Sequence, residues 1–159
     1  MLITIAAVGK LKAGPERELF DRYIERAGNA GRRVSLSFTT REFPDSRATS
    51  ALLRKNQEST AIASALAPDA VLVALDEGGK NLDSRAFAER LGKWRDDGVG
   101  DLTFAIGGAD GHGPALLAKA TLRLALGAMT WPHQLARLML VEQLYRAVTI
   151  LSGHPYHRD

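Results

Sequence analysis

The polar side chains best suited to chemistry form the end of the chain, in the run His154-Pro155-Tyr156-His157-Arg158. Imidazole, phenol and guanidinium groups placed together could recognise a polar ligand, take up a proton or neutralise an anion. Two histidines three residues apart raise the question of a metal site, but Pro155 disfavours a helix and the chain has no cysteine to complete a ligand shell. A frayed terminus is the alternative. We expect an ordered tail that belongs to an active site.

Two more polar residues lie in the apolar segment that precedes this tail. Glu142 and Arg146 stand four residues apart, which brings their side chains together on one helix face. They could form an ordinary surface pair or hold a substrate. The segment itself, residues 133–151, is apolar on nearly all sides, as in a helix buried in a core or against a copy of itself. In so short a chain this pattern favours a homodimer.

Glycine dominates a further candidate site, Gly107–Gly113, which has four glycines in seven residues directly after an apolar run. Glycine lets the backbone approach a ligand closely. The spacing is neither Gly-x-Gly-x-x-Gly nor a phosphate loop ending in Gly-Lys-Ser/Thr, so nicotinamide and NTPase sites are poorly supported. The alternative reading is a tight strand-to-helix turn. No Gly-x-Ser-x-Gly elbow is present, which argues against a serine hydrolase.

Hydrophobic periodicity predicts the elements that position these residues. Strand-like and helical stretches alternate, which predicts an α/β fold with a mostly parallel sheet flanked by helices, as a single domain over residues 1–159. Ser46 should cap the second helix, with Leu52 and Leu53 on its apolar face. We expect strands at 2–8, 34–40, 70–75, 102–106 and 122–126, and helices from 15 to 28–31, 46 to 66, 83–84 to 97, a short one from 115, and 133 to 151.

Ligands of such sheets bind beyond the carboxyl ends of the strands. Three loops with glycine lie there, after Leu75 (residues 76–80), after Ile106 and after Leu126. We expect them to meet in one crevice.

Composition narrows the class of protein. The 159 residues carry a net charge of only +3 and no cysteine, which excludes disulfides, Fe–S clusters and thiol nucleophiles and suits a reducing cytoplasm. Cations outnumber acids after Gly111, so this third of the chain should meet any anionic partner. No stretch is apolar for long enough to span a membrane, and residues 1–8 predict a strand and not a signal peptide.

Taken together, these segments closely resemble the SPOUT-class ribosomal RNA large-subunit methyltransferase H family over essentially the whole chain. The resemblance implies S-adenosylmethionine-dependent methylation of N3 of a pseudouridine in a stem-loop of bacterial 23S rRNA, on the assembled ribosome. It also implies a cytoplasmic homodimer with a C-terminal trefoil knot. The matching segments are Leu75-Asp76, Ile106–Gly111, Thr130-Trp131-Pro132-His133, Glu142-Gln143-Leu144-Tyr145-Arg146-Ala147 and His154–Arg158. The chain departs from the usual pattern at Ala109-Asp110, Trp131 and Gln134, without losing a group that the reaction needs.

By the same resemblance, the methyl donor is held by Leu75, Gly107, Gly108 and the run Leu126-Gly127-Ala128-Met129-Thr130-Trp131. The attacking N3 carries a proton that must leave, so a base is needed. We consider His157, Glu142 and, less favourably, Tyr156 for this role. Arg146 and Arg158 would neutralise the RNA backbone or polarise the carbonyls beside N3, and Tyr156 could stack on the base. Two alternatives remain: a non-catalytic ribosome- or RNA-binding factor on this fold, and a nucleotide-dependent oxidoreductase.

Overall fold

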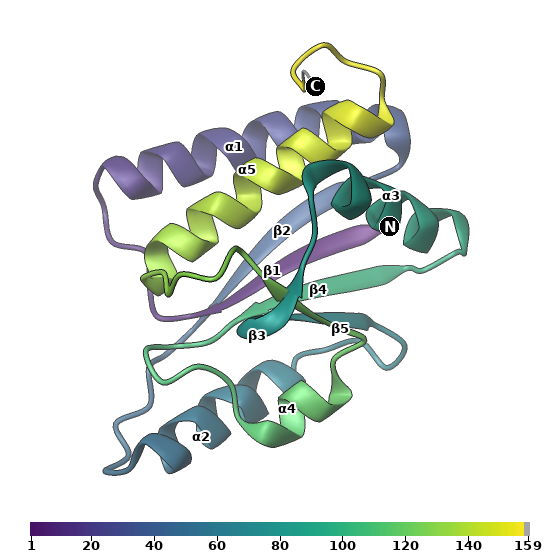
Figure 1. Ribbon diagram of the computed structural model, residues 1–159. Helices are drawn as coiled ribbons and strands as arrows, with labels where there is room; N and C mark the ends of the chain where they lie inside the picture. Colours follow the sequence, from purple (N-terminus) through teal and green to yellow (C-terminus); the bar gives the residue numbers. More distant parts are fainter. Residues whose placement is uncertain (158–159) are drawn as a thin grey trace.

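The structure is a computed structural model that describes residues 1–157, and its centre is a sheet of five parallel strands in the order β2-β1-β4-β3-β5 (Figure 1). Helices or loops connect successive strands, as parallel pairing requires. The elements are β1 (Leu2–Val8), α1 (Pro15–Gly31), the 3-10 turn η1 (Arg32–Val34), β2 (Ser37–Phe43), α2 (Ala51–Ala63), β3 (Val71–Asn81), α3 (Ser84–Asp96), β4 (Asp101–Ile106), α4 (Pro114–Lys119), β5 (Leu122–Ala125) and α5 (His133–Leu151).

Helices cover both faces of the sheet (Figure 1). The helices α1, α3 and α5 pack over one face, where Phe104 and Leu144 belong to the larger of two hydrophobic clusters. Over the other face lie α2 and α4, and Ile62 and Leu116 pack there against small residues of the strands. The predicted α/β class with a parallel sheet is therefore confirmed.

The second strand and the second helix begin later than the sequence pattern predicted. Ser35 has a left-handed backbone (φ 56°) that ends a 3-10 turn, so β2 starts at Ser37 and not at residue 34. The helix α2 is capped by Ser50, whose Oγ accepts a hydrogen bond from the Leu53 backbone N–H. Ser46 instead donates its hydroxyl to Gln57. Leu52 and Leu53, which were expected on an apolar face, are exposed.

The third strand is longer than predicted. Residues 76–80, expected as a loop, continue β3 to Asn81, and a shift of register separates the pair Leu75–Leu124 from the pair Lys80–Leu124. The glycines and charges in this run favoured a loop, but Gly79 lets the backbone of Arg123 lie close: a Cβ at position 79 would be 2.6 Å from the Arg123 carbonyl carbon. Glycine within a strand often marks such an irregularity.

The helix α5 has the predicted bounds, and other helices of the same chain bury much of its surface. It packs against α1 and α3, and Leu140, Val141, Leu144 and Val148 are fully buried without a second copy. Its all-round apolar character therefore supports a homodimer less strongly than the sequence alone indicated. Within residues 1–157, no helix is both long enough and apolar enough to cross a membrane.

Candidate active site

The carboxyl ends of β4, β3 and β5 are adjacent and in register. Ala74 in β3 pairs with Ala105 in β4, and Leu75 pairs with Leu124 in β5. Neighbouring strands lie about 4.8 Å apart. Leu75 is therefore close in space to the ends of β4 and β5, from which the chain continues to Gly107 and Leu126. The structure thus brings together the three segments that the sequence selected. The strand β3 continues past Leu75 to Asn81 and pairs there with the end of β5.

The segment from Leu126 to Trp131 is shaped by hydrogen bonds to neighbouring residues. The Trp131 indole N–H donates to the Leu126 carbonyl at 3.0 Å, which draws the two ends together. The Gly127 backbone N–H donates to Asn81 Oδ1, and the Thr130 hydroxyl donates to Glu77, both at 3.0 Å. Residues 127–131 are exposed, and Met129 is the most exposed large apolar residue of the group. The loop is therefore ordered by β3 and open to a ligand.

The glycine-rich turn after β4 is tight and rests on α2. The Gly111 backbone N–H donates to the Gly108 carbonyl at 3.0 Å, and a Cβ at position 107 would be 2.8 Å from the Gly111 carbonyl carbon. From α2, Arg54 donates two hydrogen bonds to Asp110, at 2.7 and 3.1 Å. This ion pair holds the pKa of Asp110 below its usual value. The alternative reading of the glycine segment, a tight strand-to-helix turn, is confirmed, and its role in ligand binding stays a prediction.

His112, which comes directly after this turn, is buried between β4 and the helices. One imidazole nitrogen lies 3.2 Å from the Ala105 carbonyl oxygen, and the other has no hydrogen-bond partner in residues 1–157. Burial lowers its pKa, more than the bond to Ala105 raises it. At neutral pH the imidazole is therefore uncharged and structural.

The second group of candidate residues gathers on the C-terminal half of α5. Arg146 donates to Glu142 Oε1 at 2.5 Å, and the Tyr156 hydroxyl donates to the same oxygen at 3.1 Å. The Tyr156 ring packs against Tyr145, with centroids 4.7 Å apart, and Arg146 lies 5.0 Å from its centre. Arg146 also lies 3.4 Å from His157 Nδ1. The expected ordered tail is thus present as far as His157.

The pKa shifts and hydrogen bonds of Glu142, Arg146 and Tyr156 indicate a different role for each residue. Burial, a hydrogen bond with Tyr23 and the charge of Glu142 all raise the pKa of Tyr156, in that order of size. Its phenol is therefore protonated near neutral pH and donates a hydrogen bond. Glu142 accepts from Arg146, Tyr156 and Gln143, so both of its oxygens are occupied. The bond to Glu142 raises the pKa of Arg146.

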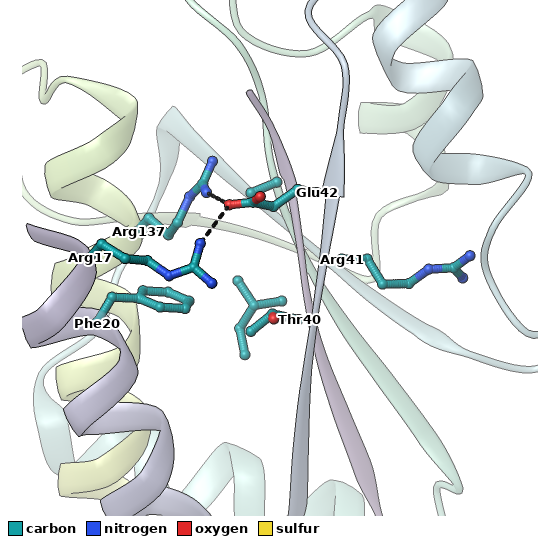
Figure 2. Close-up of a pocket in the computed structure, with 8 residues that line it drawn as sticks. Arg17, Phe20, Thr40, Arg41, Glu42 and Arg137 are labelled. Carbon is teal, nitrogen blue, oxygen red and sulfur yellow. Dashed lines mark hydrogen bonds and ion pairs between the residues drawn. The ribbon is translucent and has the colours of Figure 1, made fainter. Parts of the chain in front are cut away.

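Sequence reasoning missed one charged group, Arg137, which is only 2% exposed. Figure 2 shows its guanidinium beside Glu42, which it contacts at 2.9 Å, and Arg17 approaches the same carboxylate oxygen at 3.8 Å. Arg137 also donates to the carbonyls of Val8 and Gly9, each at 3.0 Å. These bonds fix the start of α5 to the end of β1, beside a cavity of about 170 Å³. An arginine within an apolar helix was the available signal, since arginine is almost never fully buried unless paired.

The two groups of candidate residues lie apart within one chain. The helix α5 starts at the carboxyl end of β1 and ends beside α3, where Leu151 faces Gly92 (Figure 1). At 1.5 Å per residue, Arg146 is roughly 20 Å along the helix from His133. As far as His157, where the described residues end, the tail turns back toward Glu142 and not toward the strand ends of its own chain. Arg158, predicted to take part in catalysis, lies outside the described residues.

Comparisons with known proteins agree with this architecture. Residues 1–157 match the family model described as predicted SPOUT methyltransferase. Ribosomal RNA large subunit methyltransferase H of Nitrobacter hamburgensis is 57% identical, and that of Bradyrhizobium diazoefficiens is 55% identical, each over 99% of both chains. The Brucella anthropi protein of the same name is 55% identical over the whole of both chains.

A solved structure from Legionella pneumophila, described as a methyltransferase in complex with the bound cofactor SAM, covers 91% of this chain and 66% of its own, at 13% identity and a TM-score of 0.48. That likeness is too weak to carry an argument. The family match and the full-length relatives suffice: the chain belongs to the SPOUT methyltransferases, within the ribosomal RNA large subunit methyltransferase H family.

Proposed function

We propose that this chain methylates N3 of a pseudouridine in a stem-loop of bacterial large-subunit rRNA, with S-adenosylmethionine as methyl donor, on the assembled ribosome in the cytoplasm. The observation that carries the proposal is the meeting of three adjacent strand ends, at Leu75, Gly107 and Leu126, in a chain of this family. The choice of rRNA rests on the names of the full-length relatives. We take residues 1–159 as a single domain, with the trefoil knot that the resemblance implies.

The residues at the strand ends fit a methyl donor. At Gly111 and Gly127 a Cβ would meet nothing within 4 Å, so the backbone there is open to a ligand. We assign donor binding to the following residues: Leu75, Gly107, Gly108, Leu126, Gly127, Ala128, Met129, Thr130 and Trp131. When bound, the donor supplies the reactive methyl group, and the protein must align the reactants and exclude water.

Among the three candidate bases, His157 is the best placed to take the N3 proton. The raised pKa of Tyr156 keeps its phenol protonated, and Glu142 already accepts hydrogen bonds on both oxygens. Glu142 therefore positions Arg146 and Tyr156. Arg146, beside His157, would polarise a carbonyl next to N3 and so ease loss of the proton. Tyr156, whose ring lies against Tyr145 and Arg146, would stack on the base.

The separation of the two groups supports a homodimer. Within one chain the tail lies roughly 20 Å along α5 from the strand ends, so a homodimer that places the tail of one protomer over the strand ends of its partner would complete the site. The apolar residues Met129, Trp131 and Leu135 are exposed near the strand ends and would be covered in this arrangement.

Mixing two inactive variants tests the shared site. A chain ending at Gly153 keeps the strand ends, and Gly107→Val keeps the tail. Co-refolded heterodimers should recover methyl transfer, because one of their two sites combines an intact tail with intact strand ends. If each chain forms its own site, mixtures will stay as inactive as the separate variants.

The experiment that tests the function is mass-spectrometric mapping of methyl groups in large-subunit rRNA from cells with and without this protein. We expect one N3-methylated pseudouridine to disappear with the protein and to return when the intact chain is supplied. An unchanged set of methyl groups, together with no binding of S-adenosylmethionine in solution, would instead indicate a ribosome-binding factor without catalytic activity.

A further inference from the structure

Glu58, in the middle of α2, is a buried carboxyl that the proposed methyl transfer does not use. The residue is only 6% exposed. Its Oε1 accepts a hydrogen bond from the Ser46 backbone N–H at 2.8 Å, whereas Oε2 has no partner within residues 1–157. A buried oxygen left without a hydrogen bond is costly, and such a group in a native protein calls for an explanation.

The position of Oε2 relates it to the proposed donor site. A Cβ built at Gly108 would be 2.8 Å from Oε2, so the carboxyl packs directly against the backbone of the glycine turn and no side chain intervenes. Gly108 comes just after β4 at the strand ends, beside the segments that continue from Leu75 and Leu124. The carboxyl therefore contacts the backbone of the turn to which we assign the methyl donor.

The helix α2 holds this carboxyl in place. One turn before Glu58, Arg54 pairs with Asp110 in the glycine turn, and one residue after it, the Ser59 hydroxyl accepts a hydrogen bond from the Gly113 backbone N–H at 2.8 Å. Because Arg54 has Asp110 as its partner, it does not neutralise Glu58 through a direct bond. Arg54 interacts with Glu58 only through its charge at a distance, so within residues 1–157 no cation forms a direct ion pair with Glu58.

We propose that Glu58 determines the preference of the site for the positively charged methyl donor over its product. This inference rests on the proposed function. Methyl transfer breaks the bond between the methyl carbon and sulfur, forms a bond between that carbon and N3, and releases the N3 proton to a base. The sulfur thereby changes from a sulfonium cation to a neutral thioether. In a medium of effective dielectric constant about 20, a negative charge even about 10 Å from a cation favours that cation by more than about tenfold over a neutral group.

The test compares binding of S-adenosylmethionine with binding of S-adenosylhomocysteine, by calorimetry, in the full chain and in Glu58→Gln. Glutamine keeps the size of the side chain and can still accept the Ser46 hydrogen bond. We expect the Kd for S-adenosylmethionine to rise about tenfold and the Kd for S-adenosylhomocysteine to change less than twofold. Glu25→Gln, which removes the same charge from an exposed site on α1, should alter neither value.

If both Kd values change by the same factor, or neither changes, Glu58 has a purely structural role and the inference is wrong. If the unaltered chain binds neither compound, the proposed function fails as well. Should Glu58→Gln not fold, Glu58→Asp provides the same test, because it keeps the charge but withdraws it from Gly108. In Glu58→Asp we expect the preference for the donor over S-adenosylhomocysteine to fall two- to threefold, with the Kd for S-adenosylhomocysteine unchanged. Equal changes in the two Kd values would again overturn the inference.

Discussion

The strand-end region (Leu75, Gly107, Gly108 and residues 126–131) and the tail region (Glu142, Arg146, Tyr156 and His157) differ in composition. At the strand ends, Gly107, Gly108 and Gly127 offer backbone, and the polar side chains nearby mainly fix the shape of the loops, as Thr130 does through Glu77. On α5 and the tail, charged and aromatic side chains contact one another directly, with Glu142 at the centre. Binding at the first region should therefore depend mainly on main-chain shape, with the proposed charge effect of Glu58 acting through the glycine turn, and chemistry at the second should depend on charge. Substitutions can separate the two.

Removing the tail should have the largest effect. A chain that ends at Gly153 lacks Tyr156 and His157, and we expect methyl transfer to fall at least about 1000-fold, within the range for loss of acid–base groups. Donor binding by calorimetry should change less than twofold, since the strand ends of the chain are intact. His154→Gln, at an exposed position, serves as the control and should stay near full activity. If the shortened chain transfers methyl groups as fast as the full chain, the tail takes no part in the chemistry.

Gly107→Ala should damage the strand ends and leave the tail intact. The added Cβ would lie 2.8 Å from the Gly111 carbonyl carbon, so the backbone of the turn must move. We expect donor affinity to fall about 30-fold, with a loss of about 1–3 kcal/mol in the free energy of unfolding from overpacking. Gly100→Ala is the matched control, since a Cβ there would meet nothing within 4 Å. Unchanged donor binding in Gly107→Ala would place the donor elsewhere.

The strand-end region was largely predictable from the sequence. Local patterns define strands, and the rule that ligands bind at the carboxyl ends of parallel strands selects their loops. The prediction erred where tertiary contacts override local preference. Residues 76–80 look like a loop, yet they pair with β5 because Gly79 admits the Arg123 backbone. Ser46 looks like a helix cap, but its backbone and hydroxyl bond to the side chains of α2 and Ser50 takes the cap.

The sequence predicted which residues form the tail region, but not where they lie in the fold. The spacing of Glu142 and Arg146 indicates one helix face, which the structure confirms at 2.5 Å. That Tyr156 turns back onto this pair depends on the chain reversal after Leu151, where Gly153 has a positive φ of 67°. The Glu42–Arg137 pair, in which only the arginine is buried, joins residues from distant parts of the chain, so no local pattern could have revealed it.

Glu142→Gln should test whether charge governs the tail region. The amide keeps its size but loses the charge that pairs with Arg146 and helps to raise the pKa of Tyr156. We expect methyl transfer to fall about tenfold with donor affinity unchanged, as for loss of a charge-assisted contact of about 1.4 kcal/mol. Ultraviolet titration should show the pKa of Tyr156 moving down toward its ordinary value, because a negative neighbour no longer opposes the phenolate.

Glu18→Gln, exposed on α1, is the control for that titration and should leave the pKa of Tyr156 where it is. If Glu142→Gln leaves both the rate and the tyrosine titration unaltered, the contacts of Glu142 are structural only, and the two regions differ less than their composition indicates.

The smallest expected effect concerns His112, which lies beside the glycine turn and should make the stability of the protein depend on pH. Burial lowers its pKa from the ordinary value of 6.5, so below about pH 6.5 the unfolded chain binds a proton that the folded chain does not. The free energy of unfolding should therefore decrease as pH falls through this range, by at most about 1.4 kcal/mol per pH unit. In His112→Gln, urea unfolding at pH 8 and pH 5.5 should differ less than in the unaltered chain, whereas the exposed His154→Gln should keep the full difference. Equal differences in all three would mean that His112 takes up its proton without disturbing the glycine turn.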